Sequence, residues 1–296
     1  MASFSITKNL ATLLLEDLAE ATWSRLRDAG DLNVSQGEET ITDNHLLDIK
    51  RSPVKSIRVW KCPKDREMFT GIDWEWFVGS DSLGWYRYAV QAKKLYNYKK
   101  ERDRYDALNH PVEAKDRNGA VIRKLQINVL EEYARGANAI PLYCLYNHVI
   151  RGDFGQFWHC CCEDIEPTQL GCTVTPSHVV REALRRRGCR TFDYIHSKEC
   201  TLPWRCLTLC PKIVDPKHRP LISWNLIPRQ EIGYYKEVPR SVRDLFNPPS
   251  EDTPAKQDRA HWTYDLLPEA IGDLQIIPNR ILVVELDDYE SAQIQD

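Results

Sequence analysis

The sequence predicts an α/β fold in which helices alternate with strands. Three observations support this prediction. Apolar residues recur at helical spacing near the N-terminus, two runs between residues 71 and 93 alternate as strands do, and residues 140–147 (IPLYCLYN) form a short, strongly apolar segment. A chain of 296 residues that mixes these two periods is typical of helices packed on a sheet.

The first elements are two helices and a strand. Residues 7–28 predict a helix that is closed by Gly30, and its apolar positions repeat every three or four residues: Leu10, Leu13, Leu14, Leu18, Ala21 and Leu26. A second helix is expected over residues 38–50, after Gly37. Residues 56–62 alternate apolar and polar side chains and predict a strand.

Residues 71–93 (GIDWEWFVGSDSLGWYRYAVQAK) predict two strands joined by a turn rich in glycine and serine. Side chains alternate between the faces of a strand, so Asp73 and Glu75 share one face, as do Gln91 and Lys93. If the hairpin register places Asp73 opposite Gln91, their β-carbons lie about 5 Å apart. That separation is short enough for both side chains to bind one cation.

This combination of side chains suits the hydrolysis of a phosphodiester bond. Mg²⁺ prefers oxygen ligands and usually rests on one or two carboxylates together with water and phosphate. Asp73 is the best candidate ligand, Glu75 is a second, and the amide oxygen of Gln91 is a third. Lys93 would orient the attacking water or stabilise the charge that develops at phosphorus. Glu39 could reach the same ion from the helix at 38–50.

A simpler interpretation is an amphipathic hairpin with a polar outer face, which is the usual form of an antiparallel sheet. The run Ala89-Val90-Gln91-Ala92 is apolar on both sides of the strand, so Gln91 is expected inside the protein. A buried glutamine and a buried lysine beside two carboxylates need partners or a function. The catalytic interpretation is therefore kept beside the simpler one.

Three short segments together resemble the motif of the PD-(D/E)XK phosphodiesterase superfamily: Glu39 on a helix, Gly71-Ile72-Asp73 at a strand start, and Gln91-Ala92-Lys93. The resemblance is closest to the Mrr-type restriction-endonuclease branch, in which glutamine often replaces the last glutamate. The pattern E-T-x-T-D…G-x-D-x-E-W…Q-A-K is also similar to that of an uncharacterised group of bacterial and fungal proteins placed in the superfamily.

The resemblance covers roughly residues 35–150 and implies a restriction-endonuclease-like mixed central sheet flanked by helices. It also implies a nuclease that depends on Mg²⁺, with Mn²⁺ as the alternative ion, and that cleaves DNA rather than RNA. On this basis Asp73, Glu75 and Gln91 are expected to hold the metal, and Lys93 and Glu39 complete the expected catalytic set.

We expect a nuclease-like α/β domain over residues 1–210, with its core at about 35–150, and a less regular, Pro-rich extension over 211–296 that packs on the same domain. The remaining elements are predicted by shorter patterns. These are a helix at 125–137, a central strand at 140–147, a helix at 176–187 entered at Thr175, a strand at 201–210, a loop or linker at 211–262, a short helix near 267–271 and a strand at 280–286.

A segment rich in lysine and tyrosine follows the second strand of the hairpin and contains Lys94, Tyr96, Lys99 and Lys100. Basic residues interspersed with aromatic ones can follow a phosphate backbone and stack on bases. We therefore expect these four residues to bind substrate. A second basic cluster, Arg185, Arg186, Arg187 and Arg190, is interpreted as a solvated helix face.

Ten cysteines are many for one chain, but only Cys206 and Cys210 show the short spacing typical of zinc ligands. Structural zinc is therefore not expected, and buried thiols that act as small apolar groups are favoured. A zinc site would need at least four ligands within reach of one point, from the set His159, Cys160, Cys161, Cys162, Cys172, Cys200, Cys206 and Cys210.

Several classes of protein are excluded or disfavoured. No run of 18 apolar residues occurs, so a membrane-spanning helix is not expected. No Gly-rich phosphate loop and no G-x-S-x-G motif is present. The N-terminus lacks the pattern of a secretory signal, so we expect a cytoplasmic protein (nuclear in a eukaryote) that is not secreted.

Two other hypotheses stay open beside the nuclease. One is a catalytically inactive nuclease-like module that binds nucleic acid or a protein partner through the Lys and Tyr segment. The other is a zinc-bound structural protein. Nothing in the sequence decides whether two copies form a homodimer that cuts both strands. The formal net charge of −3 gives no general support for affinity to nucleic acid.

Overall fold

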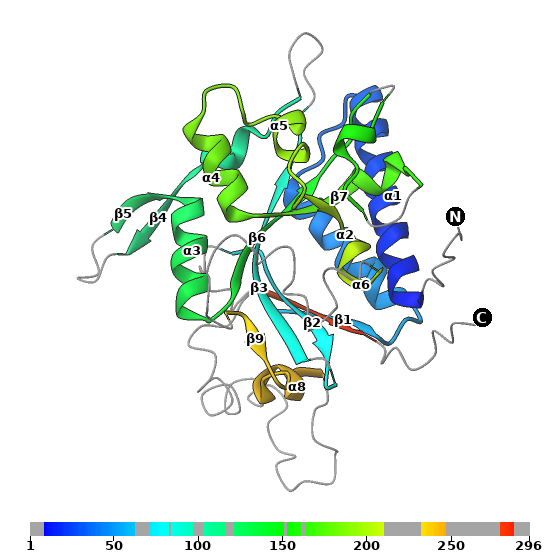
Figure 1. Ribbon diagram of the computed structural model, residues 1–296, viewed down its shortest axis with the longest axis vertical. Coiled ribbons are helices and arrows are strands. Elements are labelled where there is room, and N and C mark those ends of the chain that lie inside the picture. Colours follow the sequence, from blue (N-terminus) through cyan, green and yellow to red (C-terminus); the bar gives the residue numbers. More distant parts are fainter. Residues whose placement is uncertain are drawn as a thin grey trace, which may run out of the picture.

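The computed structural model describes residues 9–62, 72–82, 84–96, 103–115, 121–150, 153–160, 164–209, 232–246 and 279–286. Within these ranges the chain forms a mixed sheet flanked by helices on both faces (Figure 1). The strands of this sheet are β1 (Ile57–Lys61), β2 (Trp74–Ser80), β3 (Gly84–Lys94), β6 (Ile140–Tyr146), β7 (Cys172–Pro176), β8 (Leu202–Pro203), β9 (Tyr234–Tyr235) and β10 (Arg280–Glu285).

The strand order is β1-β10-β2-β3-β6-β7-β8, with β9 paired to β3 beside this path. Two pairs are parallel, β10 with β2 and β3 with β6, and the other pairs are antiparallel. A separate antiparallel hairpin is formed by β4 (Pro111–Lys115) and β5 (Val121–Leu125). The mixed α/β class expected from the sequence is therefore confirmed.

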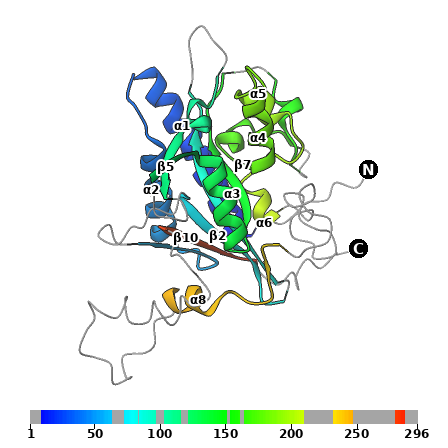
Figure 2. The ribbon, with the colours of Figure 1, turned by 90° about the vertical axis from the view of Figure 1, so that its left-hand side faces the viewer.

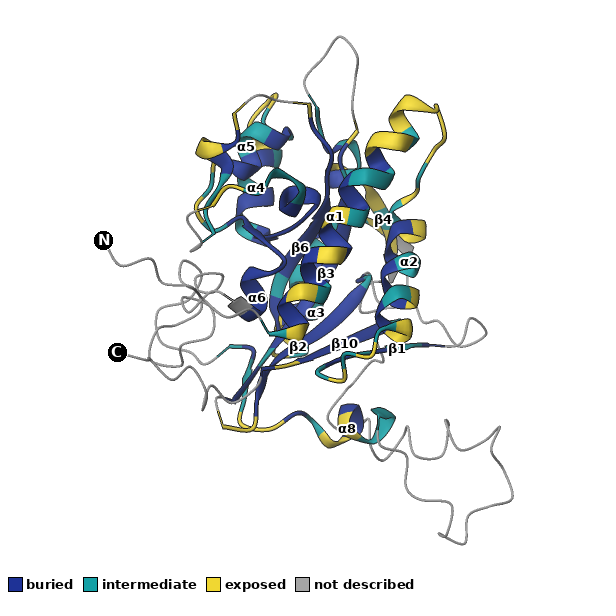
Figure 3. Cartoon of the chain, turned by 90° about the vertical axis from the view of Figure 1, so that its right-hand side faces the viewer, coloured by how far each residue is buried: buried dark blue, intermediate teal, exposed yellow. Residues whose placement is uncertain are grey.

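The α-helices are α1 (Leu10–Asp31), α2 (Glu38–Arg51), α3 (Gln126–Gly136), α4 (Ser177–Arg185), α5 (Phe192–His196), α6 (Cys206–Leu209) and α8 (Arg240–Phe246). Short 3₁₀ turns lie at Asp106–Asn109, Gly155–Phe157 and Pro167–Gly171. Figure 2 shows α3, α4 and α5 on one side of the sheet, and Figure 3 shows α1, α2 and α6 on the other.

Local sequence explains where α1 begins and ends. The side chain of Asn9 accepts a hydrogen bond from the amide of Thr12 (2.7 Å), which satisfies one of the free N–H groups at the start of the helix. At the other end, Asn33 adopts a left-handed conformation (φ 54°), and the amide of Val34 donates to the carbonyl of Ala29 (2.9 Å). The helix therefore ends at Asp31, just beyond Gly30, with Leu32 as its C-cap residue.

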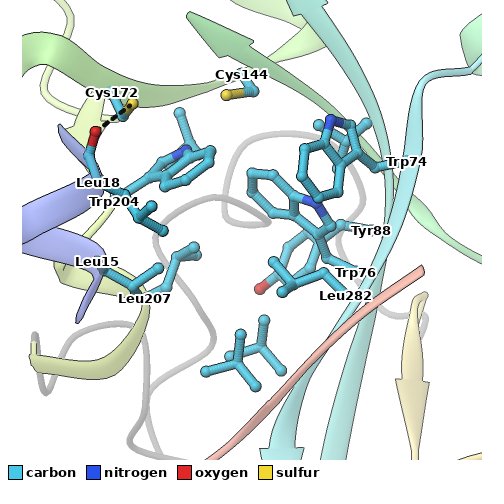
Figure 4. Packing of buried hydrophobic residues seen from close by; sticks show 14 of the residues in the cluster. Leu15, Leu18, Trp74, Trp76, Tyr88, Cys144, Cys172, Trp204, Leu207 and Leu282 are labelled. Atoms are coloured by element: carbon cyan, nitrogen blue, oxygen red, sulfur yellow. Dashed lines mark hydrogen bonds between the residues drawn. The ribbon is translucent and has the colours of Figure 1, made fainter. Parts of the chain in front are cut away.

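Alternation along the strands divides the core into two layers. Trp74, Trp76 and Val90 pack with Leu15 of α1 and Ile41 of α2. On the opposite face, residues of β3 and β6 pack with α3, α4 and α5, among them Ala89, Tyr143, Leu145, Ile127, Leu130, Val180 and Ile195. Figure 4 shows the first layer, in which Trp204 and Trp76 lie close to each other. Both layers bury large side chains and therefore stabilise the same sheet.

Most predicted elements are confirmed with small shifts of their ends: the helices at 7–28, 38–50, 125–137 and 176–187, and the strands at 56–62, 140–147 and 280–286. The hairpin of residues 71–93 is present as β2 and β3. The strand expected at 201–210 is wrong, because only Leu202–Pro203 pairs with β7 before the chain turns into α6. At the start of α4, Pro176 and not Thr175 is the N-cap residue.

Some elements were not anticipated, namely β4, β5, β7, β9, α5 and α8. The helix expected near 267–271 lies outside the described residues, as does most of the expected linker at 211–262. The last strand, β10, lies inside the sheet between β1 and β2, with Leu282 opposite Trp76 and Val59. Strand β10 therefore joins β1 and β2, which come from the N-terminal part of the chain, into one continuous sheet.

A histidine is buried under the tryptophans of the first layer. His45 of α2 is fully buried, and its Nε2 lies 2.7 Å from the hydroxyl of Thr22. That hydroxyl donates to the carbonyl of Leu18 (2.9 Å), so the histidine donates to it from Nε2. Burial lowers the pKa of His45 to about 3, and the positive charge of Arg25 adds to the shift.

The buried His45 predicts a pH-dependent stability. Its pKa is lower in the folded state than the ordinary value of 6.5, so its contribution is complete above pH 6.5 and is lost as pH falls toward 3. Replacing His45 by glutamine removes the titration and should lower the pH dependence by about 1.4 kcal/mol per pH unit between pH 6 and 4. Urea unfolding at several pH values measures this difference, and equal slopes in both proteins would contradict it.

The central position of β10 predicts a large effect of a single truncation in the last strand. Leu282 is buried in the first core layer, so Leu282→Ala should lower the free energy of unfolding by about 2–5 kcal/mol. Glu285 on the same strand is exposed, and Glu285→Ala is the matched control, with an expected change within about 0.5 kcal/mol. Chemical denaturation of both variants tests the prediction, which fails if the two losses are equal.

Candidate active site

The pairing of β2 with β3 brings two of the predicted site residues together. Trp74 pairs with Val90, so Asp73 comes opposite Gln91, and the amide of Asp73 donates to the carbonyl of Val90 (2.9 Å). The carboxylate of Asp73 accepts hydrogen bonds from the side-chain amide of Gln91 and from the backbone N–H of Ala92 (2.7 Å). The expectation that Asp73 and Gln91 are neighbours, with Gln91 inside, is confirmed.

A glutamate from α2 reaches the same place, but it is Glu38 and not Glu39. The Nζ of Lys93 lies 3.3 Å from one carboxylate oxygen of Glu38, and the backbone N–H of Lys94 donates to the other oxygen (3.0 Å). Lys93 is buried, and Glu38 lies in the first turn of the helix. The four residues that converge are therefore Glu38, Asp73, Gln91 and Lys93.

The placement expected for Glu39 is wrong. Its side chain is 81% exposed, and its carboxylate lies 3.7 Å from Arg280. Successive residues of a helix point about 100° apart, so only one of two adjacent glutamates can face the end of β3. The register of α2 against β3 gives that position to Glu38.

The placement expected for Glu75 is also wrong. Its fully buried carboxylate accepts from Arg87 Nη2 (2.6 Å) and from the hydroxyl of Tyr133 on α3 (2.7 Å). Burial opposes the charge on Arg87, but Glu75 outweighs this and raises the pKa of the guanidinium. Glu75 is therefore one half of a buried ion pair between β2 and β3, and this pair explains why it is not with Gln91.

Two features of the converging residues suit a bound cation. The Oε1 atom of Gln91 is buried and has no hydrogen-bond partner, which is costly unless a ligand is bound. Burial raises the pKa of Asp73, while the charge of Lys93 and the N–H of Ala92 act in the opposite direction. A divalent cation would satisfy the amide oxygen and favour the ionised carboxylate, so Asp73 and Gln91 fit Mg²⁺ by their chemistry.

Further charged residues surround this group, and one of them comes from the C-terminal strand. Arg280 Nη2 lies 3.1 Å from Asp43, which also accepts from Lys61 (2.9 Å). Burial raises the pKa of Asp43, but its hydrogen bonds to Lys61 and Arg280 outweigh this and lower it. No local pattern pointed to Arg280, because it is more than 180 positions from the hairpin. The helix that carries Glu38 was predicted from the sequence. The sequence pattern did not show which of its two adjacent glutamates faces β3.

The expected substrate-binding residues are placed in part. Lys94 is half-buried, its Nζ donates to the carbonyl of Gln36 (2.6 Å), and it lies 4.5 Å from the centre of the Tyr96 ring. Tyr96 is exposed, at the rim of the converging residues. Lys99 and Lys100 lie outside the described residues. Burial lowers the pKa of Lys94, and Glu38 opposes this shift.

In the part of the chain that the structure describes, no three side chains of His, Cys, Asp or Glu are grouped to hold a metal. The group at Asp73 contains two acids and one amide. His159 contacts the backbone carbonyl of His196 (2.9 Å), and Cys161 and Cys162 lie outside the described residues. The helices within the same ranges are all too short or too polar to cross a membrane.

The comparisons with known proteins identify the family of the chain. The model of a family of unknown function, DUF6615, matches residues 11–288, and the chain therefore belongs to this family. No curated protein and no solved structure matches the chain.

The ion pair of Glu75 predicts a role in stability and not in metal binding. Glu75→Gln leaves Arg87 buried without its counter-charge and should lower the free energy of unfolding by about 3–5 kcal/mol. Glu39→Gln, in the first turn of α2, should change it by less than about 0.5 kcal/mol because the side chain is exposed. Urea denaturation compares the two, and a stable Glu75→Gln variant would refute the assignment.

Proposed function

We propose that this member of the DUF6615 family is a metal-dependent nuclease that hydrolyses phosphodiester bonds, with DNA as its substrate in preference to RNA. One observation carries the proposal: Glu38, Asp73, Gln91 and Lys93 come from a helix and two adjacent strands and meet at one end of the sheet. Within this set the buried amide oxygen of Gln91 lacks a hydrogen-bond partner, which a bound cation would supply.

The order and placement of these residues support a restriction-endonuclease-like assignment within the PD-(D/E)XK superfamily. The glutamate precedes the hairpin on a helix, the aspartate begins the first strand, and the Gln-x-Lys pair ends the second. Helix α3 then leads to β6, which pairs with β3 in parallel. These features agree with the expected mixed sheet, and the motif now uses Glu38 in place of Glu39.

Mg²⁺, or Mn²⁺ in its place, would be held by Asp73 and the amide oxygen of Gln91, with Glu38 as the nearest further carboxylate. When bound, such an ion polarises the phosphate and lowers the pKa of a water molecule. The protein's own contribution is to hold these oxygens inside a largely buried site, where charge interactions are stronger than in water.

Lys93 is the residue that would act on the reacting phosphate. Its ammonium group is held by Glu38, and its side chain comes from the same strand face as Gln91. In this position it can orient a water molecule and stabilise negative charge at the phosphate. Lys94 and Tyr96 continue along the same strand and would contact the neighbouring part of the nucleic acid.

Cleavage assays test the proposal. The full-length protein is incubated with plasmid DNA and, separately, with single-stranded RNA in Mg²⁺, Mn²⁺ or EDTA. We expect cleavage with either ion and none in EDTA. Asp73→Asn, Lys93→Met and Glu38→Gln should each reduce the rate about a hundredfold or more. Glu39→Gln, the adjacent exposed glutamate, is the matched control and should cleave normally.

Thermal unfolding of each variant separates lost chemistry from lost structure. Metal-dependent cleavage that persists in both Asp73→Asn and Lys93→Met would refute the proposed site. The pattern of nicked and linear plasmid also reports whether one chain or a homodimer cuts the two strands.

A second candidate function is a catalytically inactive nuclease-like module that binds nucleic acid or a protein partner. The observation in its favour is that Gln91 carries no charge, and no third His, Cys, Asp or Glu joins Asp73 and Glu38 among the residues that the structure describes. Under this alternative the protein binds oligonucleotides with the same affinity in Mg²⁺ and in EDTA, and cleaves in neither. The same assays therefore separate the two functions.

A further inference from the structure

We propose that a pocket beside α4 and α5 receives one unpaired nucleotide of the substrate strand. This inference rests on the proposed function for its substrate but concerns residues outside the candidate active site. The pocket is open to solvent and has a volume of about 330 Å³, with Gln156, Phe157, Cys189, Asp193, Tyr194 and Ser197 in its wall. Ligand pockets usually measure about 300–1,000 Å³, so this one suits a single nucleoside.

A backbone ladder connects the pocket to the candidate active site. Tyr96, which follows Lys93 and Lys94, pairs with Arg104, and Arg104 pairs in turn with Thr191 at the pocket wall. Adjacent strands lie about 4.8 Å apart, so the wall is about 10 Å from Tyr96. Extended chain from Lys93 to Tyr96 adds about 10 Å. A strand bound at Lys93 can therefore reach the pocket within several nucleotides.

The wall offers aromatic surface and hydrogen-bonding groups together. Tyr194 is held by Lys198, whose Nζ lies 4.5 Å from the centre of its ring, and Phe157 packs edge-on against Phe192. The partly exposed ring of Tyr194 can stack on a nucleobase, whereas Phe157 is buried behind the wall. The polar part of the wall includes the carboxylate of Asp193. The wall therefore offers one partly exposed aromatic ring with polar groups around it.

Positive charge lies beside the pocket where a nucleotide phosphate would be expected. Arg185 is the last residue of α4, and Arg186 and Arg187 follow it; all three are exposed and directly precede Gly188 in the pocket wall. Arg186 and Lys198 both lie close to Glu182, at 3.1 Å and 3.7 Å. Gly188 has a positive φ of 78°, which glycine adopts easily, and it turns the chain from the helix into the pocket. These charges suit a nucleotide better than an uncharged base.

Binding of short oligonucleotides in EDTA tests the pocket without cleavage. Fluorescently labelled single-stranded oligonucleotides of dC and of dT are titrated with the full-length protein, and anisotropy gives the affinity. Ser197→Trp fills the pocket and should weaken dC binding about tenfold, as expected for one lost stacking contact. Ser82→Trp, at an exposed turn of the β2–β3 hairpin, is the matched control and should bind normally.

Two further variants test the chemistry of the proposed ligand. Arg187→Ala should weaken binding of both oligonucleotides, whereas Arg240→Ala, an equally exposed arginine on α8, should not. Normal affinity in Ser197→Trp, or unchanged affinity in Arg187→Ala, would overturn the inference.

The outcomes also separate this inference from the proposed function. A protein that cleaves DNA but binds oligonucleotides equally well with Ser197→Trp has the nuclease site and lacks the nucleotide pocket. A protein that never cleaves but loses affinity in Ser197→Trp has the pocket without the nuclease activity.

Discussion

The antiparallel pairing of β2 with β3 is the constraint on which the candidate site depends. A shift of one residue in this register would turn Gln91 and Lys93 to the opposite face and place Val90 or Ala92 beside Asp73. The register is held by the core, because Trp74 and Trp76 on β2 and Val90 on β3 must all enter the same apolar layer. The same β2–β3 register therefore places Gln91 beside Asp73 and places Trp74 and Trp76 in the apolar core layer.

The carboxylates of Asp73 and Glu75 have different partners, and the partners indicate different roles. Glu75 is neutralised by Arg87 within the sheet, and such a pair must remain intact because each charge alone would be costly to bury. Asp73 contacts a neutral amide and a backbone N–H, so its charge is less completely compensated. A carboxylate of the second kind, beside an unpartnered amide oxygen, is suited to bind a cation.

The sequence predicted features that depend on local pattern and missed those that depend on distant pairing. The alternation of residues 74–78 and the apolar neighbours of Gln91 were enough to identify the hairpin and the burial of the glutamine. The choice between Glu38 and Glu39 depends on how α2 packs on β3, and a helix pattern does not give that angle to within one residue.

The structural role of Glu75 and the position of β10 could not be predicted from the sequence, for the same reason. Glu75 and Asp73 do lie two residues apart on one strand, but the partner of Glu75 is an arginine on the neighbouring strand. The run 280–286 was recognisable as a strand, yet its place between β1 and β2 depends on pairing with residues more than 200 positions away. Arg280, at the start of this strand, consequently had no local signature.

The binding of Mn²⁺ tests the central claim most directly, since it reports on the site without a substrate. Electron paramagnetic resonance of free Mn²⁺, titrated with the protein at neutral pH, counts the bound ions and compares the wild type with Asp73→Asn and Glu75→Gln. The account predicts a site that is lost in Asp73→Asn and retained in folded Glu75→Gln. Binding that is unchanged in Asp73→Asn, or no binding to the wild type, would contradict it.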